Sequence, residues 1–224
     1  KDVGIDGFRC DVAEMVPTDF WNEARKELNN IRPVMMLSEG SIPEHHAKAF
    51  DLTYSWNIYD ALDPLLQGKR PVTLLDELFR NEHLQFPVGS LRMRFTTNHD
   101  KNAWDDPAVT KFGLDGLKLA AVLINTIPGV PMIYTGEEVA NNKKLDLFEK
   151  VDVEWSRSRE VGRMYKKLFH LRKENEALAR GEMIRLTTNS EKDVYAFARV
   201  AGKDKIVVVL NFSSEPRSAT VSVP

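Results

Sequence analysis

Cysteine is almost absent from this chain: its 224 residues include one, Cys10, so no disulfide can form within it. A single cysteine fits a reducing compartment such as the cytoplasm without identifying one. A basic excess is also missing, because 31 Lys and Arg stand against 33 Asp and Glu. This balance gives no sign of a nucleic-acid or membrane partner. No apolar run approaches the ~18 residues of a membrane-spanning helix.

What the chain does contain is an alternation of apolar runs with helical patterns. Strands are expected at 3–11, 33–37, 51–56, 91–96 and 130–134, with helices at 18–31, 43–50, 60–67, 72–84, 114–126 and 159–180. Such alternation indicates βαβ units and a parallel sheet. Four strand candidates without intervening helices follow at 183–188, 194–200, 205–212 and 219–223. We therefore expect a parallel α/β domain over 1–180 and a small antiparallel β domain over 181–224.

Three acidic residues come at the ends of separate apolar runs. Asp11 ends the first run, Glu39 follows 33–37, and Asp100 follows 91–96. The carboxyl ends of the strands of a parallel barrel meet at one rim, so this placement predicts three carboxyl groups in one cleft. Paired carboxyl groups in a cleft are the equipment for breaking a glycosidic bond.

Each of these acids also has a purely structural interpretation. Arg9 and Asp11 point to the same side of a strand, and taken alone they fit a structural ion pair as well as a catalytic pair. Glu39 could favour the start of a helix through the helix dipole. Asn98-His99-Asp100 could be a polar turn with capping side chains.

Four segments, in order, resemble the α-amylase family of glycoside hydrolases. They are Gly4-Ile5-Asp6-Gly7-Phe8-Arg9-Cys10-Asp11, Leu37-Ser38-Glu39-Gly40, Phe95-Thr96-Thr97-Asn98-His99-Asp100 and Ile127-Pro128-Gly129-Val130-Pro131-Met132-Ile133-Tyr134-Thr135-Gly136-Glu137-Glu138. The continuation Asp11-Val12-Ala13-Glu14-Met15-Val16 is similar to the neopullulanase and cyclomaltodextrinase branch. The resemblance covers about residues 1–180, and the tail resembles the family's C-terminal β domain more weakly.

The resemblance implies a partial (β/α)8 TIM barrel, about its last five strands, followed by a β-sandwich-like domain that the chain truncates. The family's first conserved segment, an acidic strand ending in Asn-His, has no counterpart here. A complete barrel of this kind needs ~250 residues. We therefore expect the chain to be the C-terminal portion of a longer enzyme, with the N-terminal half of the barrel missing, and to be inactive alone.

The resemblance also implies roles for single residues. Asp11 looks like the nucleophile, kept ionised by the Arg9 guanidinium, Glu39 like the general acid and base, and Asp100 like the third catalytic carboxylate. His99 would donate a hydrogen bond to the same sugar. The aromatic residues expected to bind substrate are Trp104, Trp56 and Tyr54, with Trp104 in a polar loop beyond a catalytic strand.

The expected function is retaining hydrolysis of α-glucosidic bonds in starch-derived oligosaccharides. A nucleophile and an acid of this kind lie ~5–5.5 Å apart. A transglycosylase on the same substrates and a non-catalytic glucan-binding relative remain as alternatives. No cofactor and no metal are expected in this portion, since no oxygen-rich loop has calcium spacing, although the family allows calcium in the full-length enzyme.

Overall fold

The computed structural model describes residues 3–223 and divides them into two compact units. Unit 1 consists of residues 3–56 and 77–93, and unit 2 of residues 57–76 and 94–223. None of the helices among residues 3–223 is both long and apolar enough to cross a membrane.

Five strands form the first sheet, in the order β1-β2-β3-β4-β5. Their bounds are Gly7–Cys10 for β1, Met35–Ser38 for β2, Leu52–Tyr54 for β3, Leu91–Arg94 for β4 and Val130–Pro131 for β5. Neighbouring strands pair in parallel from β1 to β4. The expectation of a partial parallel barrel is therefore confirmed, although every strand is shorter than its apolar run.

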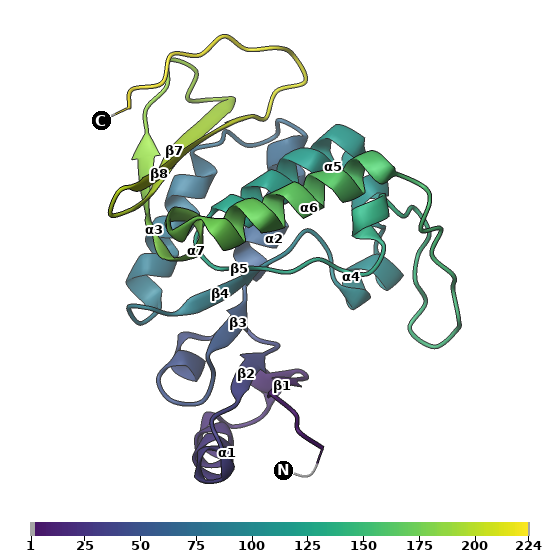
Figure 1. Ribbon diagram of the computed structural model, residues 1–224, viewed down its shortest axis with the longest axis vertical. Coiled ribbons are helices and arrows are strands. Elements are labelled where there is room, and N and C mark those ends of the chain that lie inside the picture. Colours follow the sequence, from purple (N-terminus) through teal and green to yellow (C-terminus); the bar gives the residue numbers. More distant parts are fainter. Residues whose placement is uncertain (1–2, 224) are drawn as a thin grey trace. The chain divides into compact units, whose positions relative to one another are not determined.

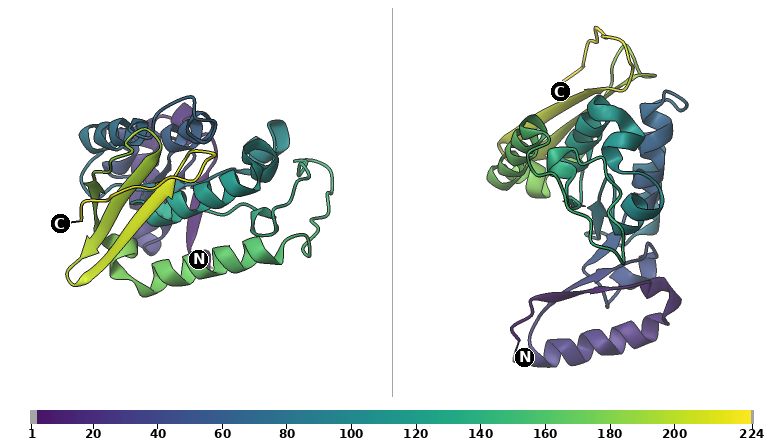
Figure 2. Two further views of the ribbon diagram at one scale, coloured as in Figure 1. Left: turned by 90° about the horizontal axis from the view of Figure 1, so that it is seen from above. Right: turned by 90° about the vertical axis from the view of Figure 1, so that its right-hand side faces the viewer.

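Within residues 3–56 of unit 1 lie the long helix α1 (Thr18–Ile31) and two short 3-10 turns, η1 (Ala13–Met15) and η2 (Pro43–His46). Figure 2 shows α1 running beside β1 and β2. Trp21 and Leu28 of α1 pack against the buried Met36 of β2 and Phe50. The helix expected at 43–50 was wrong beyond its first turn, because the backbone leaves the helix after His46 and turns into β3.

Two helices follow β3: α2 (Trp56–Leu66) and α3 (Leu74–Gln85). The helix expected at 60–67 thus begins four residues earlier, and the one expected at 72–84 is shifted by one to two residues. Buried residues of α2, among them Ile58 and Leu62, show that its apolar face is in the core.

Unit 2 is built around two helices that lie side by side, α5 (Ala108–Thr126) and α6 (Arg159–Glu174) (Figure 1). Leu117 and Ala121 of α5 share a buried cluster with Val161 and Tyr165 of α6. The helix expected at 159–180 breaks at Asn175, which has extended backbone angles and precedes the short α7 (Glu176–Arg180).

The start of α5 and the segment before it also differ from expectation. The helix begins at Ala108 rather than near Leu114, with a kink at Gly113, whose φ of 71° is accessible to glycine at no steric cost. Residues that we expected to form a polar loop make the short helix α4 (His99–Trp104), because the Asn98 side chain accepts a hydrogen bond from the Lys101 amide and caps it.

The second sheet is antiparallel, as expected, and contains β6 (Glu182–Leu186), β7 (Val194–Ala201) and β8 (Asp204–Asn211). The strand expected at 219–223 was wrong: Val221 makes an isolated bridge to Thr188 and no continuous ladder. The buried Arg199 of β7 donates to Thr126 O at 2.5 Å and Gly181 O at 2.9 Å. A cation thus satisfies a carbonyl at the C-terminal end of α5, where the helix dipole favours positive charge.

Candidate active site

The register of β1 and β2 brings Asp11 and Glu39 to the same level. Cys10 pairs with Ser38, so the two acids are the next residues along neighbouring parallel strands. The Glu39 amide donates to Cys10 O at 3.0 Å and extends the pairing by one residue. Both side chains therefore leave the sheet at the carboxyl ends of their strands, as the sequence predicted.

Arg9 connects the two acids through a single guanidinium. Its Nη1 forms an ion pair with Asp11 Oδ1, and its Nη2 lies 2.5 Å from Glu39 Oε1. The Asp11 side chain is 72% exposed, whereas that of Glu39 is 12% exposed. The Asp11 carboxylate is therefore exposed to solvent, whereas the Glu39 carboxylate is largely buried.

Tyr54 and Trp56 complete this part of unit 1. Arg9 Nε donates to the Tyr54 hydroxyl at 3.4 Å, and Tyr54 is buried. Burial lowers the pKa of Arg9, but hydrogen bonds to Tyr54 and Asp11 outweigh it and leave the pKa raised. Trp56 packs on Tyr54 with ring centroids 5.4 Å apart. Tyr54 thus supports Arg9, and its place as a sugar-binding side chain stays a prediction.

A second set of contacts fixes the backbone around Glu39. The Val12 amide donates to Glu39 Oε2 at 2.7 Å, and the Ala13 amide donates to Glu39 O at 3.1 Å. The carboxylate of Glu14 accepts a hydrogen bond from the Ser41 amide. A Cβ at Gly40 would lie 2.6 Å from Glu14 Cγ and 2.8 Å from Ser38 Oγ, so a larger residue there would displace these side chains.

The residue before Glu39 forms a buried pair with His45 of η2, a histidine for which a surface position is the more common case. Ser38 and His45 are both fully buried, with Ser38 Oγ 2.8 Å from His45 Nδ1. Burial lowers the pKa of His45, so the ring is neutral at ordinary pH. The contact anchors the end of β2 directly before Glu39.

His99, Asp100 and Trp104 belong to α4 in unit 2. His99 Nε2 lies 3.4 Å from Asp100 Oδ2 in the first turn of the helix. Trp104 is its last residue and is 68% exposed, as a stacking platform would have to be. Burial, together with the charge of Asp100, raises the pKa of Tyr134.

Sequence reasoning missed Glu137, the one acid of its segment that is almost fully buried. It lies in η3 (Glu137–Val139) and accepts hydrogen bonds from the Thr96 hydroxyl, the Tyr134 amide at 2.9 Å and the Tyr165 hydroxyl at 3.1 Å. Burial raises its pKa to about 7 despite these three donors. The sequence signal that was available for this turn is Gly136, which precedes Glu137 and has a φ of 88° in the structure.

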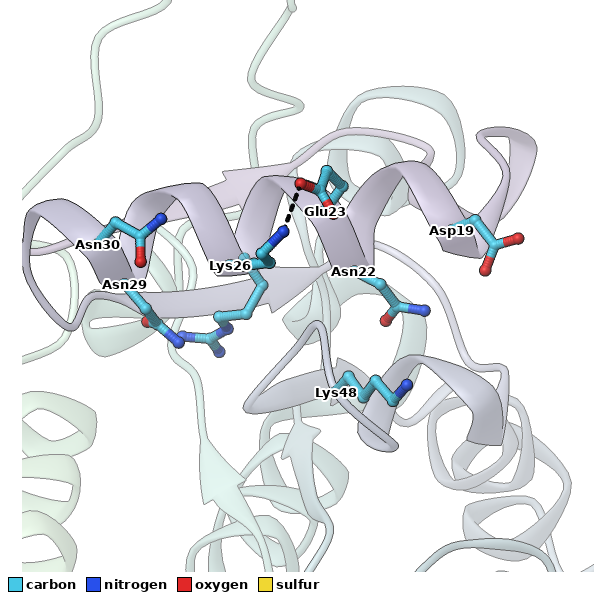
Figure 3. A pocket seen from close by; sticks show the side chains of 8 residues that line it. Asp19, Asn22, Glu23, Lys26, Asn29, Asn30 and Lys48 are labelled. Atoms are coloured by element: carbon cyan, nitrogen blue, oxygen red, sulfur yellow. Dashed lines mark hydrogen bonds and ion pairs between the residues drawn. The ribbon is translucent and has the colours of Figure 1, made fainter.

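A cavity of about 610 Å³ opens elsewhere in unit 1 and is unrelated to these residues (Figure 3). It lies along α1 and is lined mostly by charged and amide side chains, among them Asn22, Lys26, Asn29 and Lys48. Lys26 is engaged there by Glu23 at 3.0 Å. None of the predicted site residues lines this cavity.

Acidic side chains at the carboxyl ends of parallel strands, in a partial barrel followed by a small antiparallel sheet, are the arrangement of a barrel glycoside hydrolase. No family model matches the chain. It is 29% identical to the α-amylase MalA of Haloarcula japonica, over 98% of the chain and 33% of that protein. It is 26% identical to neopullulanase 2 of Thermoactinomyces vulgaris, over 99% of the chain and 39% of that protein.

A solved structure shows a similarity to the same kind of protein. The crystal structure of a maltogenic α-amylase, AmyB from Thermotoga neapolitana, superposes with a TM-score of 0.84 at 30% identity, covering 94% of this chain and 49% of that one. The chain thus spans less than half the length of each of these proteins. The chain is therefore similar to part of several α-amylase-family glycosidases, and the resemblance that its sequence predicted is confirmed.

Proposed function

We propose that this chain carries the nucleophile and the acid/base of a retaining glycoside hydrolase that cleaves α-glucosidic bonds in starch-derived oligosaccharides. The observation that carries the proposal is the shared guanidinium: Arg9 contacts the carboxylates of both Asp11 and Glu39. The names of the relatives, an α-amylase, a neopullulanase and a maltogenic α-amylase, support the substrate class.

The proposed reaction uses the two acids in turn. Asp11 attacks the anomeric carbon and forms a covalent glycosyl ester, while Glu39 gives its proton to the departing glycosidic oxygen. Glu39 then takes a proton from water, whose oxygen attacks the same carbon and releases Asp11. The exposure of Asp11 suits the group that must reach the sugar, and the donors around Glu39 suit a group that must stay in place.

The remaining site residues keep the roles that their resemblance implies. Asp100 would stabilise the positively charged transition state, and His99 would donate a hydrogen bond to a sugar hydroxyl. Trp104 has the exposure of a stacking surface. Trp56, half-buried against Tyr54, has less ring surface to offer.

We also propose that further strands complete the barrel beside β1. Among the described strands, β1 pairs with β2 alone, so its other edge leaves backbone N–H and C=O groups without a sheet partner. Apolar side chains of this strand pair are exposed, with Phe8 at 39% and Met35 at 50%. Open edges and exposed apolar residues of this kind are what a neighbouring strand and helix cover.

The first experiment tests reaction type and substrate together. The protein carrying this chain is incubated with maltooligosaccharides and with pullulan, and the products are followed by chromatography and by NMR of the newly formed anomer. Shorter sugars with retained α configuration are expected. Longer sugars would indicate transglycosylation, and binding without any product would indicate a non-catalytic relative. An inverted anomer would refute Asp11 as the nucleophile.

Two matched substitutions separate the acids. Asp11→Asn removes the nucleophile and is expected to lower turnover by orders of magnitude while oligosaccharide binding survives. Glu39→Gln removes the proton donor, so glycosides with poor leaving groups should lose the most activity. Equal losses on activated aryl glycosides would count against the role of Glu39 as acid.

A further inference from the structure

Val12, the residue directly after the proposed nucleophile, has an unusual backbone conformation. Its φ and ψ are both 42°, in the left-handed region. Among residues 3–223, Val12 and Ala140 are the two non-glycine residues with positive φ. A β-branched side chain in this region crowds the following carbonyl, so the conformation persists only where the surroundings impose it.

The surroundings of Ala13 impose it here. Ala13 is fully buried, its amide donates to Glu39 O at 3.1 Å, and its carbonyl accepts a hydrogen bond from Trp21 Nε1 at 2.9 Å. Asp11, on the other side, continues from β1, whose register with β2 is set by four residue pairs. Val12 must therefore turn the chain from the strand into the fixed Ala13. Val12 as a whole residue is 46% exposed, so burial of its isopropyl group does not explain the turn.

The turn changes where the Val12 amide points. That N–H donates to Glu39 Oε2 at 2.7 Å, while the other carboxyl oxygen, Oε1, faces Arg9 Nη2. Each oxygen of Glu39 thus has its own donor, one from a side chain and one from the backbone. A backbone donor set by a strained dihedral angle is rigid, since moving it requires moving Ala13 and its buried contacts.

We propose that Val12 is a positioning residue: its left-handed backbone aims the amide at Glu39 and thereby fixes the orientation of the acid/base carboxyl. The inference rests on the proposed function, because orientation matters to catalysis only if Glu39 transfers the proton. It predicts that the amide, and not the valine side chain, is the part that contributes.

The sharpest test deletes this amide alone. Replacing Val12 by the corresponding α-hydroxy acid turns the N–H into an ester oxygen and keeps the isopropyl group. Rates are measured on a pair of aryl α-maltosides, one with a poor and one with a good leaving group. The expected loss is about 10- to 100-fold on the poor leaving group, the range for a hydrogen bond to a charged group, and much smaller on the good one.

The matched control is the same backbone change one residue later. An α-hydroxy acid at Ala13 deletes the bond to the carbonyl of Glu39 and leaves the bond to its carboxyl. It is expected to lower stability, and to change both rates by a similar factor. Equal leaving-group dependence in the two ester variants would overturn the inference, since the effect would then belong to the local fold.

Val12→Gly provides the second, genetically simple variant. Glycine reaches the same φ without steric cost and keeps the amide, so the ratio of the two rates should stay within about twofold of the parent. A ratio that falls as far as in the Val12 ester would assign the effect to the side chain and refute the proposal. If the parent itself cleaves neither maltoside, the proposed function has failed instead, independently of Val12.

Discussion

Glu137→Gln should remove a pH dependence of stability that the wild-type protein has between about pH 4.5 and 7. Glu137 is almost fully buried, and its surroundings are the Thr96 hydroxyl, the Tyr134 amide, the Tyr165 hydroxyl and the neighbouring Glu138. Burial, the largest cause, raises the pKa of Glu137 to about 7, and the charge of Glu138 adds to it. The three hydrogen-bond donors act in the opposite direction without cancelling the rise.

The sign follows from where the proton is held. The folded protein keeps the Glu137 proton up to about pH 7, whereas the unfolded chain releases it near pH 4.5. The stabilisation is thus fully present below pH 4.5 and is lost as the pH rises through the pKa of the folded state. A difference of about 2.5 pH units, at about 1.36 kcal/mol per unit, corresponds to a loss of about 3 kcal/mol in the free energy of unfolding.

Urea unfolding of the two proteins at several pH values between 4.5 and 8 measures this loss as the difference between their free energies of unfolding. Taking the difference removes other groups that titrate in this range, such as His46, whose pKa burial lowers to about 4. Tyr165→Phe is the matched control: it removes one donor, so the loss with rising pH should grow. If the free energies of unfolding of the wild type and the Gln variant changed with pH in parallel, the assignment of this dependence to Glu137 would be refuted.

Two further substitutions test the packing that supports the site. Gly7→Ala would place a Cβ 2.3 Å from Met35 O, so it should weaken the pairing of β1 with β2. We expect it to lower the free energy of unfolding by about 1–3 kcal/mol and to lower activity. An unchanged urea midpoint would contradict this expectation. Arg199→Met would leave the buried Thr126 carbonyl without its donor and should cost about 1–3 kcal/mol by thermal unfolding, whereas Arg217→Met, at a half-exposed ion pair, should change little.

Local sequence patterns predicted a helix or strand correctly where that element is determined mainly by its own residues. The helix at 18–31 has the bounds expected from its apolar periodicity, because Pro17 precedes it and one face packs inward. The antiparallel strands after Gly181 were also found, since their apolar runs are separated by turn residues. Helix α4 was missed because one capping contact from Asn98 decides it, and a capping side chain looks the same in sequence as one in a polar turn.

The sequence alone determined which side chains could do the chemistry: Asp11 and Glu39 stand at the ends of apolar runs, and their identity and spacing predicted neighbouring strands. Only the tertiary structure decided how they are held. The register of β1 against β2, the ion pair of Arg9 with Glu39, and the hydrogen bond that the left-handed turn at Val12 directs to Glu39 each join residues about 28 positions apart. The burial of Glu137 likewise depends on Tyr165, which lies on a helix far along the chain. Local propensity acts over a few neighbouring residues, whereas these contacts exist only once separate strands and helices have packed together.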